Sequence, residues 1–388
     1  MRIVLTGGGT GGHVLPFESI IEAIRTIHKN EKDTFPAFLD PEILELFFLG
    51  VSSAEIDTLF RTYDIPVTNI PSGKMRRYAS ALNVVDILFR LPLGITIALW
   101  RMWQIMPDVV VSKGGYGSIP TILAAVVYRI PILLHESDVV PGSANKISMK
   151  FASAVTIGFS ASREYLQQFT KKLFVTGTPV RLALLHSNKQ SAKKIFGFDE
   201  QRPLLLVMGG SQGAQQINEA LLAILPNIID KMSVLHITGI TQHVSVAKVA
   251  SEILAPSPHK AMYKSVPYLG ETMVSALVAA DVIVSRAGAS SLAEIARLRV
   301  PSLLIPLATS ANDHQRKNSL AFEAAGAALV LDPTNVSPHL LEQGIVRLVS
   351  DTALRETLSK NLEVLDFPNA APDIAKLVFQ IASGFRPI

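Results

Sequence analysis

Short apolar runs alternate with longer segments of mixed polarity along the whole chain. In the first half, the apolar runs have the length of buried strands, and the segments between them repeat apolar residues at helical spacing. Strands are predicted at residues 2–6, 45–50, 108–112, 130–134 and 154–157. Helices are predicted at residues 13–29, 53–62, 116–128 and 144–151. Alternation of this kind is typical of a parallel α/β domain.

A polar stretch at residues 186–194 is followed by a second run of the same pattern, so we place a domain boundary between about 180 and 200. Strands are predicted in this half at residues 204–208, 233–238, 261–265, 281–284, 302–306 and 327–331. Helices are predicted at residues 213–230, 242–254, 271–279, 289–298 and 313–325. The two halves therefore look like distant copies of one architecture.

Length and composition favour two buried cores. The chain has 388 residues, of which 48% are hydrophobic and 18% are charged, and such a length indicates about two domains. The absence of cysteine excludes disulfides, thiolate chemistry and cysteine-based zinc sites. The sequence opens directly into the strand at residues 2–6, without the basic region and long apolar core of a signal peptide, so we expect a cytoplasmic protein.

The region at residues 74–103 combines basic and aromatic side chains, whereas the net charge of the whole chain is only +4. It contains both tryptophans, Trp100 and Trp103, and its apolar run is interrupted by Asp86 and Arg90, which makes it a poor transmembrane helix. Such a region suits a membrane surface, where aromatic rings lie at headgroup depth and cations meet anionic lipids. A pair of helices buried against the sheet fits the sequence equally well. We expect no nucleic-acid partner.

Two glycine-rich loops, at residues 7–12 and 209–213, each follow a predicted strand and precede a predicted helix. Glycine lets backbone N–H groups approach an anion, and the next helix presents its positive end there. A diphosphate is a natural ligand, although glycine also serves simply to turn the chain. Neither loop continues into the Gly-Lys-Ser/Thr of a P-loop, and no carboxylate ends the second strand as in a nicotinamide-dinucleotide site. Both of those enzyme classes fit poorly.

Polar residues that follow other predicted strands indicate sugar and nucleotide handling. In the first half these are His13 behind the first glycine loop, the turn at residues 113–118 and the strand end at residues 135–138. In the second half, residues 285–294 and 313–318 open two helices. Helix N-termini, serine hydroxyls and a carboxylate suit a nucleoside diphosphate. Ordinary helix capping explains each motif equally well when it is taken alone.

In combination, these motifs resemble the MurG family, the enzymes that transfer N-acetylglucosamine from UDP-N-acetylglucosamine (UDP-GlcNAc) to lipid I in peptidoglycan synthesis. The resemblance covers nearly the whole chain and follows the family's order. The matching motifs are Gly8-Gly9-Thr10-Gly11-Gly12-His13 with Pro16, Gly114-Gly115-Tyr116, His135-Glu136, Gly177-x-Pro179-Val180-Arg181, Gly209-Gly210-Ser211-Gln212-Gly213-Ala214, Ser285-Arg286-x-Gly288-Ala289 with Glu294, and Asp313-His314-Gln315 with Asn318.

The resemblance implies the α/β GT-B fold, in which two Rossmann-like parallel-sheet domains face each other across a cleft. It implies an acceptor-binding and membrane-contacting domain at residues 1–183 and a UDP-sugar-binding domain at residues 184–355. A last segment, residues 356–388, is expected to be helical around residues 370–383 and to return to the N-terminal domain.

The resemblance also implies roles for individual residues. The implied catalytic residues are His13, His135 and Glu136, with His13 as our first choice of general base, because a neutral imidazole accepts a proton near neutral pH. His13 could instead bind the acceptor's diphosphate or the glycine loop, and the His135-Glu136 pair could be a structural tie. The implied acceptor or diphosphate contacts are Thr10, Gly11, Gly12, Gly114, Gly115, Tyr116, Asp138 and Asn145. The implied UDP-GlcNAc contacts are Arg181, Gly210, Ser211, Gln212, Gly213, Tyr268, Ser290, Ser291, Glu294 and Gln315.

The chain departs from the usual motifs of the family in three places. Ser137-Asp138 stands where Gln-Asn usually follows His-Glu, Lys113 precedes and Gly117-Ser118-Ile119 follows the Gly114-Gly115-Tyr116 motif, and Arg316 replaces a second glutamine seen in some members. The first departure bears on the specificity for the donor sugar. We interpret the chain as a divergent member, whose acceptor is either lipid I or another polyprenyl-diphosphate sugar.

The implied reaction is an inverting transfer to the C4 hydroxyl of the N-acetylmuramyl residue of lipid I, giving lipid II. The chain contains no Asp-x-Asp, so we expect no metal site and no cofactor. The expected partners are UDP-GlcNAc, lipid I and an anionic membrane surface that binds residues 74–103, which would make the protein peripheral at the cytoplasmic face of the membrane. A UDP-GlcNAc 2-epimerase and a non-catalytic nucleotide-sugar sensor or membrane scaffold are the alternatives.

Overall fold

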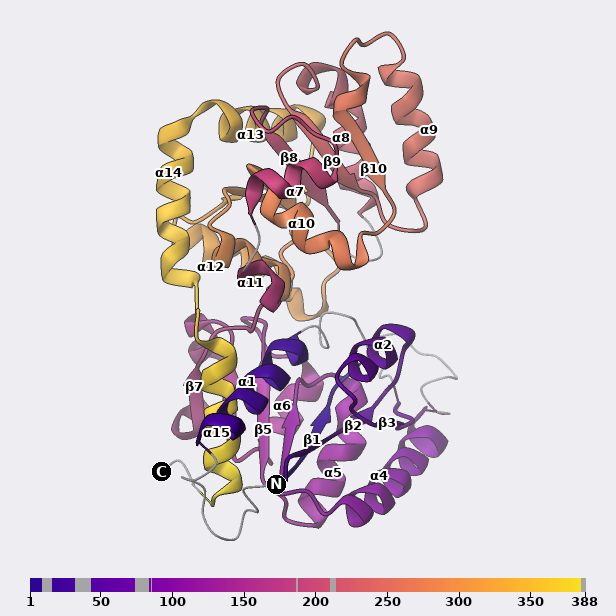
Figure 1. Ribbon diagram of the computed structural model, residues 1–388, viewed down its shortest axis with the longest axis vertical. Coiled ribbons are helices and arrows are strands. Elements are labelled where there is room, and N and C mark those ends of the chain that lie inside the picture. Colours follow the sequence, from indigo (N-terminus) through magenta and orange to yellow (C-terminus); the bar gives the residue numbers. More distant parts are fainter. Residues whose placement is uncertain are drawn as a thin grey trace. The chain divides into compact units, whose positions relative to one another are not determined.

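The computed structural model describes residues 1–8, 16–31, 43–73, 84, 86–185, 188–209 and 214–384, and it divides the chain into two compact units. Unit 1 comprises Met1–Val180 and Phe367–Ile388, and unit 2 comprises Arg181–Asp366 (Figure 1). The sequence analysis placed these boundaries after residues 183 and 355, so the structural boundaries lie slightly earlier and distinctly later, respectively.

Unit 1 is built on a seven-stranded parallel sheet in the order β3-β2-β1-β4-β5-β6-β7. Both faces of this sheet are covered, so its central strands are continuous apolar runs: Ile3, Val4 and Leu5 of β1 are all fully buried. The strands are β1 Arg2–Thr6, β2 Glu45–Gly50, β3 Val67–Asn69, β4 Val109–Ser112, β5 Ile132–Glu136, β6 Ala154–Ile157 and β7 Leu173–Val175.

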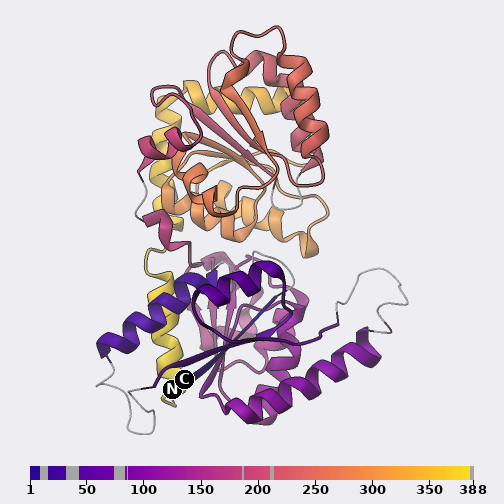
Figure 2. The same ribbon diagram turned by 45° about the vertical axis from the view of Figure 1, so that its right-hand side comes forward.

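Helices cover both faces of this sheet (Figure 2). One core joins β1 to α1, α2 and α15, and the other joins the opposite face of the sheet to α4, α5 and α6. The helices of unit 1 are α1 Pro16–Glu31, α2 Ala54–Thr62, α4 Leu91–Ile105, α5 Ile119–Val127, α6 Ser143–Met149 and α15 Ala370–Ala382. Its short turns are the π-helical η3 Asp86–Arg90 and the 3-10 turns η4 Tyr116–Ser118, η5 Ser160–Tyr165 and η6 Gln167–Lys172.

The C-terminal helix α15 belongs to unit 1, although it follows unit 2 in the sequence. It packs on α1, as Figure 1 shows, and buries Ile374, Val378 and Ile381 in the core. Where the chain re-enters the unit, a Cβ on Gly177 would lie 2.1 Å from the Cβ of Phe367, so a side chain there would obstruct the return. The predicted helix around residues 370–383 is confirmed.

Unit 2 contains a six-stranded parallel sheet in the order β10-β9-β8-β11-β12-β13. Its strands are β8 Leu204–Met208, β9 Ser233–Ile237, β10 Tyr263–Val266, β11 Val282–Ser285, β12 Ser302–Leu304 and β13 Leu329–Val330. Its helices are α7 Lys189–Ile195, α8 Gln215–Ile228, α9 His243–Leu254, α10 Met273–Ala279, α11 Ala289–Leu298, α12 His314–Ala324, α13 Pro338–Ser350 and α14 Thr352–Asn361. Its short turns are η7 Leu182–Leu185, η8 Lys260–Met262, η9 Gly270–Thr272, η10 Ala311–Asp313 and η11 Leu362–Leu365.

The two units repeat one strand order. In each, the first strand lies between the second and the fourth, so the order reverses between β1 and β4 in unit 1 and between β8 and β11 in unit 2. Ligands of open parallel sheets bind outside the carboxyl ends of the strands at such a reversal. Both glycine loops and most of the predicted site residues follow strands at these two places.

Residues 189–194 of the polar stretch, where a domain boundary was predicted, belong to a helix. Helix α7 begins after Asn188, whose side-chain oxygen accepts hydrogen bonds from the Gln190 and Ser191 amides, as in a typical N-cap. The buried face of this helix carries Lys193, which pairs with Asp281. A helix whose packing includes ion pairs has a polar sequence, which explains why it resembled a linker.

Candidate active site

The turn after β4 carries the Gly114-Gly115-Tyr116 motif, and its shape depends on glycine. Gly114 and Gly115 have φ values of +78° and +81°, a region that side chains disfavour. A Cβ on Gly114 would lie 2.0 Å from Oδ1 of Asn145. That same oxygen accepts a hydrogen bond of 3.0 Å from the Gly115 amide. The predicted acceptor residues Gly114, Gly115 and Asn145 are therefore in direct contact.

Glu136, at the end of β5, is buried beside this turn. Its Oε2 accepts a 2.7 Å hydrogen bond from the side-chain amide of Asn145, and its Oε1 accepts one of 3.0 Å from the backbone N–H of Asp138. Burial raises the pKa of Glu136 to about 7, an effect that Asp138 reinforces and that these two hydrogen bonds and the charge of Lys113 oppose. The carboxylate thus stabilises the turn through Asn145.

His135 points away from this network. Its side chain is fully buried, and Nδ1 lies 2.9 Å from the Thr156 hydroxyl on β6. Burial, and then the charge of Lys113, lowers the pKa of His135 well below its usual value, so the ring is neutral. Within the described part of the chain, Nε2 has no hydrogen-bond partner. This geometry favours the structural role that the sequence left open for His135.

Lys113 lies between β4 and the glycine turn and is only 1% exposed. Its ammonium donates a 2.6 Å hydrogen bond to Oγ of Ser137. Two of the departures from the family motifs are therefore in contact with each other. Burial lowers the pKa of Lys113 to about 7, against the attraction of Glu136 and Asp138.

In unit 2, two predicted donor contacts form an ion pair. Nε of Arg181 lies 2.6 Å from Oε1 of Glu294, and its Nη2 lies 3.0 Å from Oε2. Both side chains are largely buried, and a two-pronged guanidinium–carboxylate pair of this kind is strong and geometrically specific. Arg181 begins unit 2 and Glu294 lies on α11, so the pair attaches the start of the unit to the helix behind β11.

The other predicted donor residues lie around the same edge of the second sheet. Ser290 and Ser291 are in the first turn of α11, which begins after Gly288. Gln315, in the first turn of α12, accepts a 2.9 Å hydrogen bond from the Leu307 amide after β12. Tyr268 follows β10, and about half of its side chain is exposed.

Eight predicted site residues lie outside the described residues. They belong to the two glycine loops: His13, Thr10, Gly11, Gly12, Gly210, Ser211, Gln212 and Gly213. For the described ranges, no group of three or more His, Asp or Glu side chains is arranged to hold a metal ion.

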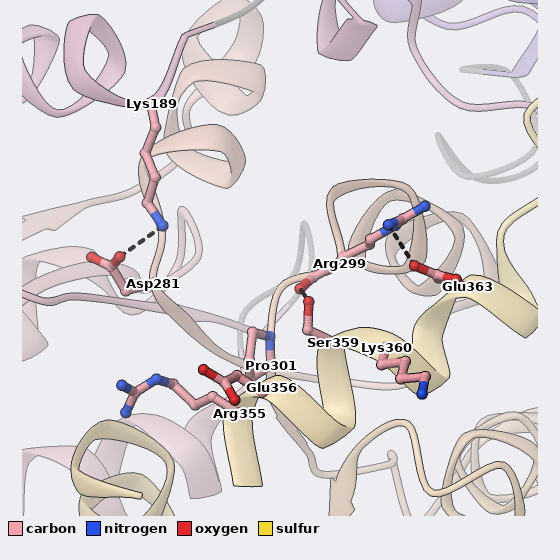
Figure 3. A pocket seen from close by; sticks show the side chains of 9 residues that line it. All are labelled: Lys189, Asp281, Arg299, Pro301, Arg355, Glu356, Ser359, Lys360 and Glu363. Carbon is pink, nitrogen blue, oxygen red and sulfur yellow. Dashed lines mark hydrogen bonds and ion pairs between the residues drawn. The ribbon is translucent and has the colours of Figure 1, made fainter. Parts of the chain in front are cut away.

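A polar pocket of about 490 Å³ lies elsewhere in unit 2 (Figure 3). It is lined in part by Asp281 and Pro301, which precede β11 and β12, so it lies toward the amino ends of these strands. Two of its four cations form ion pairs, Lys189 with Asp281 at 2.7 Å and Arg299 with Glu363 at 2.6 Å. The predicted donor residues lie at the opposite, carboxyl ends.

Comparison with known proteins identifies the family. Residues 37–157 match the glycosyltransferase family 28 N-terminal domain, and residues 204–378 match the glycosyltransferase family 28 C-terminal domain. A UDP-N-acetylglucosamine–N-acetylmuramyl-(pentapeptide) pyrophosphoryl-undecaprenol N-acetylglucosamine transferase of Lachnospira eligens is 34% identical over 351 residues, covering 90% of this chain and 91% of that one. The chain belongs to the MurG family.

Solved structures share the fold of this chain. MurG of Acinetobacter baumannii superposes with a TM-score of 0.70 at 23% identity, covering 97% of this chain and 98% of that one. The UDP-GlcNAc 2-epimerase of Neisseria meningitidis, solved with UDP-GlcNAc, reaches a TM-score of 0.69 at 14% identity, covering 98% and 100%. These likenesses establish the fold, and the predicted GT-B class is confirmed. Membership of the MurG family rests on the sequence matches.

The sequence analysis missed how some of the MurG-family residues are connected. It treated Lys113 and Ser137 as separate departures, whereas they form one hydrogen bond. Their positions carried a usable signal, because Lys113 directly follows the predicted strand at residues 108–112, Ser137 lies three residues after the one predicted at residues 130–134, and these two strands pair in the sheet. It also did not foresee that Arg181 and Glu294 pair with each other.

Proposed function

We propose that this chain transfers N-acetylglucosamine from UDP-GlcNAc to the C4 hydroxyl of the N-acetylmuramyl residue of lipid I, forming lipid II with inversion at the sugar's C1. The observation that carries the proposal is the 34% identity to the transferase of Lachnospira eligens, which extends over nine-tenths of both chains. The 2-epimerase alternative has only the shared fold in its favour, since its similarity is limited to 14% identity.

In the proposed reaction, the acceptor oxygen forms a bond to C1 while the bond from C1 to the diphosphate breaks. The acceptor hydroxyl loses its proton to a general base, for which His13 is our candidate. Glu136 is less suited to that role, because its buried carboxylate already accepts hydrogen bonds from Asn145 and Asp138. Its contacts support a role in shaping the acceptor turn.

On the donor side, Arg181 and Glu294 would meet the nucleotide. A guanidinium suits the negative charge that develops on the departing diphosphate, and a carboxylate accepts hydrogen bonds from ribose hydroxyls. The N-terminal end of α8, behind the second glycine loop, would add its dipole. Because these groups can stabilise the leaving group, we propose that a metal ion is dispensable. Loss of activity in EDTA that Mg²⁺ restores would contradict this.

We further propose that the outer face of η3 and α4 contacts an anionic membrane surface. One side of α4 packs Ala98, Met102 and Ile105 into the core. Large apolar side chains are exposed on η3, on the other side of α4 and just after α4, and these are Ile87, Leu88, Phe89, Leu93, Trp100, Trp103 and Met106. Helix α4 is thus buried on one face and exposed on the other. Its exposed apolar face suits contact with a membrane surface, the first of the two interpretations that the sequence allowed.

No described helix combines the length and apolar character needed to cross a membrane. Both tryptophans of the chain lie on the exposed face of α4, with ring centroids 5.2 Å apart, so intrinsic tryptophan fluorescence reports on this face alone. We expect vesicles that contain an anionic lipid and a brominated acyl chain to quench it. Unchanged fluorescence at saturating vesicle concentration would contradict membrane contact.

The activity is tested by measuring UDP release from UDP-GlcNAc with and without a lipid I analogue and by identifying any disaccharide. Release that depends on the acceptor, with a β-1,4-linked product, supports the proposal. Release without an acceptor, together with formation of the C2 epimer, would favour the epimerase. Transfer to a different polyprenyl-diphosphate sugar but not to lipid I would show that this other sugar is the acceptor.

A further inference from the structure

Lys113 is a buried cation with few partners. Within the described residues, its ammonium donates one hydrogen bond, to the Ser137 hydroxyl, which is neutral. An ammonium can donate three, and removing it from water is costly unless its charge is compensated. Because burying this charge is costly, we infer that the ammonium of Lys113 has a functional role in addition to its contribution to packing.

Lys193, the buried lysine of unit 2, provides a contrast. It is 4% exposed, yet its ammonium lies 2.8 Å from Oδ2 of Asp281 and donates to the backbone carbonyls of Glu200 and Arg202 at 3.1 Å and 2.9 Å. All three of its donors are therefore used. Lys113 has no such set, and the charges that compensate it belong to Glu136 and Asp138, which attract it without a direct ion pair.

The carboxylate of Glu136 connects Lys113 to the glycine turn. The Glu136 carboxylate accepts a hydrogen bond from the side-chain N–H of Asn145, and the side-chain oxygen of Asn145 accepts one from the backbone N–H of Gly115. A protonated Glu136 would lose part of its capacity to accept hydrogen bonds, and the chain of bonds to Gly115 would weaken. Among the described residues, the ionisable groups whose charges act on Glu136 are Asp138 in the following loop and Lys113 after β4.

We propose that Lys113 is a positioning residue, whose buried positive charge favours the ionised form of Glu136, so that Glu136, through Asn145, maintains the Gly114-Gly115 turn in its acceptor-binding shape. Ser137 completes the arrangement by accepting the one hydrogen bond of Lys113. The inference rests on the proposed function for the statement that this turn binds the acceptor. The charge relation itself does not depend on that statement.

The first test is a pH titration of the full-length protein by NMR, followed at the backbone amide of Gly115. The variant is Lys113→Met, because methionine has a similar length and suits a buried position. Without the cation, Glu136 is harder to ionise, so the midpoint of the Gly115 titration should rise, by up to about one pH unit. Lys193→Met, the matched control, should leave the midpoint unchanged. Equal midpoints in the wild type and Lys113→Met, or no titration at Gly115, would overturn the proposal.

The second test measures transfer to the lipid I analogue as a function of pH. At pH 7, Lys113→Met should raise the KM for the acceptor by up to about fivefold, since Glu136 with a pKa of about 7 is half ionised there and a rise of one pKa unit leaves about a tenth of it ionised. At pH 9, where Glu136 is ionised in both proteins, the KM should return toward the wild-type value, and the donor KM should not change at either pH. A defect that is independent of pH would overturn the proposal. A wild-type protein that does not transfer would refute the proposed function, while the Gly115 titration would still decide the role of Lys113.

Discussion

Each unit has a buried glutamate at its predicted site, and the two glutamates are stabilised in different ways. In unit 1, Glu136 accepts hydrogen bonds from the neutral groups of Asn145 and Asp138. In unit 2, Glu294 is paired with the guanidinium of Arg181. The first arrangement shapes the backbone of a turn, whereas the second joins two side chains that are themselves predicted to bind the donor. The glycine turn of unit 1 is therefore held in shape by its own contacts, whereas a donor that used Arg181 and Glu294 as proposed would have to open or share their ion pair.

The largest effect is expected from Glu294→Gln. Neutralising one partner of a buried charged pair leaves the other uncompensated, and the ribose hydroxyls would lose a charged acceptor. We expect kcat/KM for UDP-GlcNAc to fall about 10²-fold, with little change in the acceptor KM. Glu363→Gln is the matched control, because Glu363 pairs with Arg299 on the surface, and such pairs contribute little. A selective loss of acceptor affinity in Glu294→Gln would contradict the proposal that unit 2 binds the donor and unit 1 the acceptor.

Asn145→Ala should act on the other substrate. It removes the hydrogen bond to the Gly115 amide and one of those to Glu136, which leaves a buried carboxylate incompletely satisfied. We expect kcat/KM for the acceptor to fall about 30-fold, while the donor KM stays near its wild-type value. Asn227→Ala removes a similar but exposed bond to Glu342 and should change neither. Equal losses for both substrates would show that the two units are not specialised as proposed.

Gly114→Ala tests whether the Gly114-Gly115 turn is preformed, that is, rigid in the absence of the acceptor. Its positive φ and its close approach to Asn145 leave no room for a methyl group. We expect the free energy of unfolding, measured with urea, to fall by about 1–2 kcal/mol. At Gly142, which has a φ of −62° and open space around its Cα, alanine should cost much less. If both variants lost the same stability, the turn would be more adaptable than the structure indicates.

Much of the fold could be predicted because central parallel strands are apolar on both faces. The strands at residues 2–6, 45–50, 154–157 and 204–208 have the predicted bounds. The outer strands β3 and β7 were missed, because each has only three residues and β3 includes Thr68 and Asn69. Helices α13 and α14 were also missed, although Ser337 and Asp351 cap their N-termini.

The site was predictable as a set of positions but not as a set of contacts. Residues that follow parallel strands gather at one edge of a sheet, which is why Gly114, Glu136 and Asn145 could be grouped. The pairing of Arg181 with Glu294 depends on side chains 113 positions apart, and the burial of Lys113 depends on what packs around it. Sequence periodicity contains neither kind of information.

The smallest effect is expected at a third carboxylate, Asp281, which belongs to neither site. It accepts hydrogen bonds from Lys189, Lys193 and the Leu204 amide. Burial raises the pKa of Asp281, but these bonds outweigh it and keep the pKa below its usual value. Because the folded pKa is depressed, the stabilisation is present above the unfolded pKa of about 4 and is lost as the pH falls through the folded value.

Asp281→Asn should thus be less stable than wild type at pH 7, and the difference in urea midpoint should shrink as the pH falls below about 4. Since Asp281 lies away from the predicted donor residues, both substrate KM values should stay unchanged, and a pH-independent difference in stability would mean that shape rather than charge matters there.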